Sequence, residues 1–241
     1  MRVTLLGTGD TTGTPTVGCG CDTCERAREL GVERSRFAVH VENGRTGESL
    51  LIDLSPDFRS QFLTHDVPLP DAALVTHIHF DHLDGLGNAY RLFDDLPVHA
   101  TGEVDPVTEE SVAGTIRRKY DYLDRVTVHD HDPMAPFRTC GFDVRFVPVD
   151  HPPLLCYGVV VEDPETGAKC SLTGDTSYGI PEASRAALVD PDLLLADGIV
   201  PASAARRHPL GGKHSDADGV PLTLGPHHMS RAGALHLSPE F

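Results

Sequence analysis

Three imidazoles and one carboxylate stand within six residues in the segment His77-Ile78-His79-Phe80-Asp81-His82. The segment directly follows the apolar run 72–75, which is typical of a buried strand. Imidazole and carboxylate groups are the ligands of zinc and other borderline divalent metals. Alternate residues of an extended backbone point to the same side, so the first two histidines are predicted to share one metal. The carboxylate and the third histidine lie past the bend, nearer a neighbouring metal. A solvated His-rich loop is the competing interpretation, and the density of ligand types argues against it.

This run resembles the signature of the metallo-β-lactamase superfamily of metal-dependent hydrolases. The resemblance implies an α/β fold of the αββα sandwich type, two sheets with helices outside. It also implies two divalent metal ions at the active site, zinc or manganese. His77 and His79 would bind the first ion, and Asp81 and His82 the second, with Asp81 also taking part in catalysis.

The same resemblance predicts the remaining ligands at strand ends further along the chain. His151, in Asp150-His151-Pro152-Pro153, follows the alternating run 142–147 and corresponds to the third histidine on the first metal. Asp175, in Gly174-Asp175-Thr176, follows the run 170–173 and corresponds to the carboxylate that bridges the two metals. A loop histidine and a turn aspartate are the competing interpretations of these two residues.

The family's final ligand histidine stands in a Thr-His-x-Ser-His type ending, which this sequence lacks before Phe241. The segment 226–235 resembles the helix start that precedes that ending. Two alternatives follow: the domain is truncated at its C-terminus, or His227, His228 or His236 takes the vacant role. His228 matches by position a histidine that faces substrate in the related cyclic phosphodiesterases, and we predict it as the proton donor to the leaving oxygen.

A narrower resemblance comes from the amino end, where Leu5-Leu6-Gly7-Thr8-Gly9 and Gly13-Thr14-Pro15 lead to Cys19, Cys21 and Cys24. It points to the branch containing the phosphoribosyl 1,2-cyclic phosphate phosphodiesterase, in which a C-x-C-x-x-C cluster holds a structural zinc. Three thiolates can surround a tetrahedral ion at about 2.3 Å each. In the relatives the fourth ligand is the last histidine of the missing ending, so this cluster would bind zinc incompletely, use a water or recruit a distant histidine. The remaining cysteines are expected to be small core residues: Cys140, Cys156 and Cys170.

The composition is acid-rich and lysine-poor. Asp and Glu number 36 against 20 basic residues, of which three are lysines, and the net charge is −16. Such a balance keeps a protein hydrated in concentrated salt, which suggests a halophile, although ordinary acidic proteins share it. It argues against non-specific binding of nucleic acid, which needs clustered Lys and Arg. A chain of 241 residues is long enough for one large domain, predicted to span 1–241.

The first residues are too quickly broken by glycine for a signal peptide, and no apolar run approaches a membrane span. We therefore expect a cytoplasmic protein without membrane contact, where thiols stay reduced. The oligomeric state is left open, a homodimer included. One basic island interrupts the acidic chain and is predicted to grip substrate phosphate, with a solvated loop as the alternative. Its members are Arg206, Arg207, His208, Lys213 and His214.

Ten strands are predicted from short apolar or alternating runs. They are 3–6, 37–41, 50–53, 72–76, 98–101, 126–129, 142–149, 157–161, 170–173 and 193–196. Two helices are predicted from their caps, one running from Ser55-Pro56 to Leu63 and one from Asp105-Pro106 to Leu123.

Three functions are compatible with these observations. The first is a phosphodiesterase that acts on a small cyclic phosphate or a related phosphodiester, favoured by the cysteine cluster. The second is a nuclease similar to the transfer-RNA 3′-end processing enzymes, which carry a protruding arm that this sequence does not show as an insertion. The third is a truncated metal-binding protein without activity.

Overall fold

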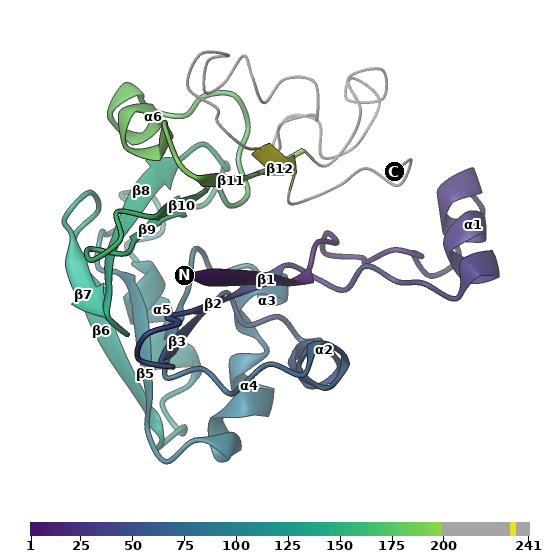
Figure 1. Cartoon of the computed structure of the whole chain (residues 1–241), viewed down its shortest axis with the longest axis horizontal. Helices are drawn as coiled ribbons and strands as arrows, with labels where there is room; N and C mark the ends of the chain where they lie inside the picture. The colour runs from purple at the N-terminus through teal and green to yellow at the C-terminus, as the bar shows by residue number, and fades with distance from the viewer. Residues whose placement is uncertain (199–231, 235–241) are drawn as a thin grey trace.

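The computed structural model describes residues 1–198 and 232–234, and within these residues the chain forms two six-stranded sheets that face each other (Figure 1). The first sheet contains, in spatial order, β1 (Arg2–Gly7), β2 (Ala38–Glu42), β3 (Ser49–Ile52), β4 (Ala72–Leu74), β5 (Leu96–Thr101) and β6 (Val126–His131). The second contains β7 (Phe137–Thr139), β8 (Phe142–Val149), β9 (Cys156–Glu162), β10 (Lys169–Leu172), β11 (Leu193–Ala196) and β12 (Ala232–Ala234), also in this order.

The direction of the strands brings several strand ends to one edge of the sandwich. In the first sheet β3, β4, β5 and β6 run parallel, and in the second β8 runs antiparallel to β9, which runs antiparallel to β10. β8 and β10 therefore point the same way. Parallel strands end at a common edge, which is where such sheets place their functional side chains. Figure 1 shows this edge between the two sheets.

Helices cover the outer faces. α2 (Phe58–His65) packs on β1, α5 (Val112–Lys119) on β5 and β6, and α6 (Glu182–Leu188) on β8. α3 (Phe80–Leu83), α4 (Leu86–Ala89) and the short 3₁₀ helix η1 (Tyr90–Leu92) follow β4. α1 (Asp22–Leu30) stands at one end of the molecule, away from both sheets (Figure 1). The layers are those of the predicted αββα sandwich, which is confirmed.

The core lies between the sheets and beneath the helices. Leu50, Leu51 and Ile52 of β3 are all 0% exposed, because a central strand is covered on both faces. This is why β3 reads as a continuous apolar run and β8, whose burial alternates, reads as an alternating one.

All ten predicted strands are present, with ends shifted by a residue or two.

The predicted helix from Asp105 is wrong at its start. The Asp105 carboxylate accepts hydrogen bonds from Val107 N (2.7 Å) and Thr108 N (3.0 Å), which closes a turn instead of opening a helix. The helix begins at Val112, after Ser111, whose hydroxyl caps Gly114 N at 3.0 Å.

A second correction concerns the segment 226–235. The helix start expected there is wrong for residues 232–234, which form β12 and pair in parallel with β11. The rest of that segment lies outside the described residues. β7, α1 and α6 were not predicted, because β7 is three residues long and the two helices bury few side chains.

Two similar hairpin turns close the end of the sandwich opposite the common strand edge. Residues 43–48 join β2 to β3, and residues 163–168 join β9 to β10, each with a backbone bond of 2.8 Å across its base. Nη1 of Arg45, in the first turn, donates to both carboxylate oxygens of Asp163, in the second turn, at 2.8 and 2.6 Å. The ion pair therefore connects the two sheets at this end.

A histidine cluster marks the junction of the edge strands β6 and β7. The ring of His131 stacks on Phe137 with centroids 3.6 Å apart, and His99 Nδ1 lies 2.8 Å from His131 Nε2. His99 is 8% exposed. Burial, followed by the neighbouring histidines, lowers the pKa of His99 from 6.5 to about 4.

This lowered pKa predicts acid sensitivity. Above pH 6.5 His99 is neutral in the folded and the unfolded chain, and between pH 6.5 and about 4 only the unfolded chain takes up the proton. The free energy of unfolding should therefore fall as the pH drops through this window, by about 3 kcal/mol from this residue. In denaturant unfolding with a chelator present, His99→Gln should make the free energy of unfolding depend less steeply on pH between 6.5 and about 4. Exposed His65→Gln is the control, and an unchanged slope in His99→Gln would contradict the prediction.

Candidate metal centre

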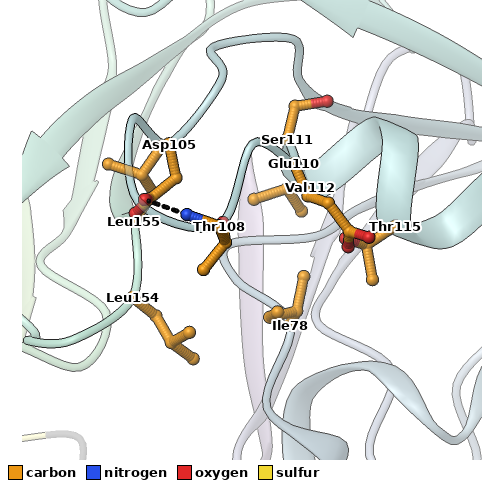
Figure 2. A pocket seen from close by; sticks show the side chains of 9 residues that line it. All are labelled: Ile78, Asp105, Thr108, Glu110, Ser111, Val112, Thr115, Leu154 and Leu155. Carbon is orange, nitrogen blue, oxygen red and sulfur yellow. Dashed lines mark hydrogen bonds between the residues drawn. The ribbon is translucent and has the colours of Figure 1, made fainter.

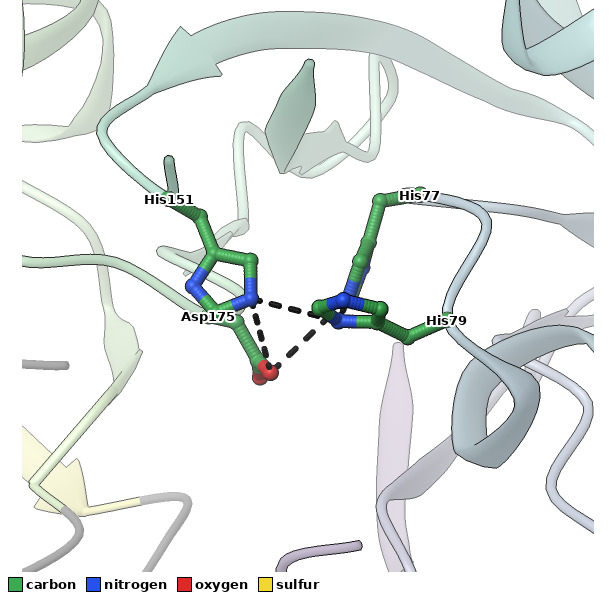
Figure 3. Close-up of side chains that lie close together, drawn as sticks. All are labelled: His77, His79, His151 and Asp175. Carbon is green, nitrogen blue, oxygen red and sulfur yellow. Dashed lines mark hydrogen bonds and ion pairs between the residues drawn. The ribbon is translucent and has the colours of Figure 1, made fainter. Parts of the chain in front are cut away.

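The common strand edge gathers four of the predicted ligand residues. His77 and His79 follow β4, His151 follows β8 and Asp175 follows β10. One ligand atom of each lies within 4.8 Å of the others, and Figure 3 shows the three rings and the carboxylate turned toward one another. Side chains from both sheets thus meet at one point.

The separations of these atoms fit a tetrahedral ion. His77 Nε2 is 2.9 Å from His79 Nδ1, and His79 Nδ1 is 3.3 Å from His151 Nε2. Asp175 Oδ2 is 3.9 Å from Nε2 of both His77 and His151. Four ligands at about 2.1 Å from a tetrahedral metal would lie about 3.4 Å apart. The set could therefore hold one divalent ion with small adjustments of the side chains.

A second group of possible ligands, His82 and Asp81, adjoins the same Asp175 oxygen. His82 Nε2 is 3.4 Å from Asp175 Oδ2 and 3.6 Å from Asp81 Oδ2. His82 Nε2 and Asp81 Oδ1 are buried and have no hydrogen-bond partner among the described residues. Buried polar atoms normally have one, so this pair fits a bound cation. Thr11, from the loop after β1, donates to Asp81 Oδ2 at 2.7 Å and holds the carboxylate.

Asp53 is a site residue that the sequence reasoning missed. It follows β3, is 0% exposed, and accepts hydrogen bonds from Thr76 N (2.8 Å), Thr76 Oγ1 (2.8 Å) and His82 Nδ1 (2.6 Å). Because the Thr76 hydroxyl donates to Asp53, it accepts from His77 Nδ1 at 3.0 Å. Asp53 thus turns Nε2 of both His77 and His82 toward the cluster, as outer carboxylates commonly do for metal-binding histidines.

The pKa values suit a cation site. Burial lowers the pKa of His77 well below its ordinary value, and burial together with His151 lowers that of His79. Both rings are therefore neutral, the form that binds metals. Burial alone would lower the pKa of His82, but Asp175 and Asp53 outweigh it and raise that pKa well above its usual range. A metal ion held by His82 Nε2 would replace the proton on that nitrogen, while Asp53 accepts the proton on Nδ1.

The cysteine cluster forms a separate candidate site. The sulfur atoms of Cys19, Cys21 and Cys24 lie within 4.8 Å of one another at the start of α1, and Thr16 N donates to Cys24 Sγ at 3.3 Å. Thiolates at about 2.3 Å from a tetrahedral zinc would lie about 3.8 Å apart. The backbone N–H of Cys24 lowers the pKa of Cys21, while burial raises that of Cys24. Within residues 1–198 no fourth ligand joins the three thiols.

Several predicted site residues lie outside the described residues. They are the basic island, Arg206, Arg207, His208, Lys213 and His214, and the histidines His227, His228 and His236. Their roles stay predictions.

In the described part of the chain, no helix combines the length and apolar character that a membrane crossing requires.

The facing sheets and the histidine and aspartate side chains at their common edge define the fold class of metal-dependent hydrolases with a metallo-β-lactamase fold. Residues 48–238 match the model of the beta-lactamase superfamily domain. The chain belongs to this superfamily, and it resembles the PhnP branch within it.

Known proteins give the same picture of the fold. The chain superposes on a diphosphatase from the PhnP family with a TM-score of 0.81 and 26% identity, covering 99% of this chain and 87% of that one. It superposes on the short form of human tRNase Z with a TM-score of 0.72 and 18% identity, covering 99% and 93%. It is 34% identical over 152 residues to an octanoyltransferase from Porphyromonas gingivalis, covering 62% of this chain and 29% of that protein. The chain spans 29% and 20% of the lengths of two curated relatives that it matches.

Proposed function

We propose that the protein is a phosphodiesterase that acts on a small cyclic phosphate or a related phosphodiester. The observation that supports this proposal is the position of Asp175, whose Oδ2 lies within 3.9 Å of Nε2 of three imidazoles, those of His77, His82 and His151. His77, His79 and His151 would hold one ion, and Asp81 and His82 the other. When bound, such a pair of ions makes water a nucleophile at neutral pH and neutralises charge on phosphate oxygens.

The chain's own residues would position the reaction. Thr11 and Asp53 fix the orientations of Asp81 and His82, so these two groups need not reorganise during catalysis. Asp81, at 3% exposure, can accept a proton from an attacking water. His228 is proposed as proton donor to the leaving oxygen, and the basic island as the contact to substrate phosphate. Both rest on the sequence.

The similarity to a PhnP-family diphosphatase supports a phosphate substrate. The alternative is a tRNA 3′-processing nuclease, because tRNase Z has the same fold. The net charge of −16 favours the small substrate. The composition also leads us to propose a salt-rich cytoplasm as the working environment.

One experiment separates these functions. Bound metal per chain is measured together with hydrolysis of a ribose cyclic phosphate, an aryl phosphodiester and a precursor tRNA, in high salt with added zinc or manganese. Turnover of the cyclic phosphate above that of the RNA supports the proposal. Preferred cleavage of the RNA would overturn it in favour of the nuclease, and one metal without turnover would favour a metal-binding protein without activity.

The cysteine cluster is proposed to hold a structural zinc. Cys24→Ser should lower bound zinc by about one ion per chain, since a neutral hydroxyl is a poor substitute for a thiolate. Cys140→Ser is the matched control, because Cys140 is a half-buried thiol that donates to Ser49 O at 3.4 Å, far along the chain from the cluster. Metal analysis after dialysis gives the readout. Equal zinc contents in the two variants would rule the site out.

A further inference from the structure

A pocket of about 90 Å³ lies beside the loops that carry the metal-site histidines (Figure 2). One wall is the loop that carries His77 and His79, and another is the loop that carries His151. The third wall is the segment 105–111, which leads into α5, together with the start of that helix. Four of the nine lining residues are branched aliphatic, namely Ile78, Val112, Leu154 and Leu155, and the other five are polar or acidic. Figure 2 shows Ile78 and Leu154 on opposite sides of the pocket. The lining therefore combines branched aliphatic side chains with polar ones.

The polar side chains of the wall are occupied by their own chain. The Asp105 carboxylate accepts from Val107 N and Thr108 N, and the Ser111 hydroxyl caps Gly114 N. The Glu110 carboxylate accepts from Thr115 Oγ1 at 2.8 Å and from Arg118. None of the lining residues is cationic, and the Asp105 carboxylate would repel an anion. The pocket thus favours an uncharged group that needs no hydrogen bonds.

Hydrogen bonds within the protein hold the segment 103–110 in place before any ligand binds. Glu109 N donates to Asp105 O at 2.8 Å and Asp105 N to Glu110 O at 2.9 Å, which close the segment on itself. Tyr157, on β9, donates through its hydroxyl to Glu103 Oε2 at 2.8 Å and attaches the start of the segment to the second sheet. A ligand entering such a pocket loses little free energy in ordering it.

The pocket shares its walls with the metal centre. Ile78 stands between His77 and His79 in the chain, and Leu154 N donates to His151 O at 3.2 Å, so Leu154 closes the turn that begins at His151. Val107, on the same segment as Asp105, is an apolar side chain that is 88% exposed. A substrate whose phosphorus lies at the metal centre would therefore have its next substituent beside this pocket.

We propose that the pocket binds an uncharged, apolar ester group of the substrate, of branched-alkyl or phenyl size. The substrate class is then a phosphodiester with one apolar arm, such as an alkyl or aryl ester, and not one with two sugar arms. The phosphodiester part of this statement rests on the proposed function. The binding of an apolar group does not, and it can be measured without turnover.

The binding test uses the δ1-methyl NMR signals of isoleucine in metal-loaded protein, titrated with benzyl alcohol or with glycerol. The Ile78 signal should shift saturably with benzyl alcohol and stay in place with glycerol, while buried Ile52 and Ile180 serve as internal references. Val112→Thr keeps the shape of the side chain but adds a hydroxyl, and it should weaken binding roughly tenfold. Leu155→Asn, at a half-buried position, should do the same. Val32→Thr, near α1, is the matched control with no expected effect.

The kinetic test uses 4-nitrophenyl phosphodiesters whose second ester group is methyl, isobutyl, phenyl or glyceryl. In the wild-type protein kcat/KM should rise from methyl to isobutyl and phenyl, and Val112→Thr should remove most of this rise through KM. An equal rate for all four esters, or the same rise in Val112→Thr and wild type, would overturn the pocket proposal. If no ester is hydrolysed, the proposed function fails, and the NMR titration alone decides on the pocket.

Discussion

Asp175→Asn is expected to lower phosphodiester hydrolysis by on the order of 10³-fold, because it removes the one charge shared by both proposed metal sites. The carboxylate oxygen lies 3.4 Å from His82 Nε2 and 3.9 Å from those of His77 and His151. Asparagine keeps the shape but offers a neutral oxygen or an N–H. Bound metal should fall together with kcat, measured by metal analysis and steady-state kinetics on the same sample.

Asp163→Asn is the control for that experiment. Asp163 is also a buried carboxylate, but it lies in the turn between β9 and β10, and its partner is Arg45 at the far end of the sandwich. We expect a lower free energy of unfolding in this variant and unchanged metal content and kcat. If Asp175→Asn retained full metal content and near wild-type turnover, the role of Asp175 as the shared ligand would be refuted.

Asp53→Asn is expected to lower metal affinity and activity by about 10- to 100-fold, although it replaces none of the proposed metal ligands. The asparagine would turn its amide N–H toward either His82 Nδ1 or Thr76 N, both of which donate to Asp53 in the native protein. His82 can relieve the conflict by moving its proton to Nε2. That tautomer directs an N–H at Asp175 and Asp81, where the metal should bind.

The measurement is a zinc titration with and without Asp53→Asn, combined with NMR assignment of the His82 tautomer. Asp71→Asn gives a matched control, because Asp71 also accepts a backbone N–H, from Ser49 at 2.8 Å, but at the opposite end of β3. Loss of affinity with the native tautomer retained would show that Asp53 acts through something other than the orientation of His82.

The strands and most of the site's geometry could be predicted from sequence. The strands could be recognised because their burial is regular, and the segment 77–82 because imidazole and carboxylate groups cluster where an apolar run ends. His151 and Asp175 are isolated residues, which only the resemblance to the superfamily pointed to. Asp53 was missed because one aspartate after one strand looks like any turn. The signal lay in the topology: β3 and β4 are parallel neighbours, so Asp53 and Thr76 leave the sheet side by side. A single sequence does not reveal which strands are neighbours.

The helix expected from Asp105 failed for a local reason. An Asp-Pro pair caps a helix or closes a turn with the same side-chain hydrogen bonds, and here the carboxylate closes a turn. The same turn then shapes the wall of the apolar pocket beside the metal centre. α1 was missed because only Cys24 and Ala27 of its residues are buried, which leaves almost no apolar periodicity to read.

The Arg45–Asp163 ion pair and the metal centre lie at opposite ends of the sandwich, and each joins one sheet to the other. The ion pair thus links the two sheets permanently at one end, whereas a metal ion would link them at the other end only while it is bound. An ion held by side chains of both sheets adds its binding free energy to the cohesion of the two sheets. Without the ion, we expect the separation between the two sheets to fluctuate more at the metal centre than at the turns. The protein would then be most flexible next to the site where the proposed substrate binds.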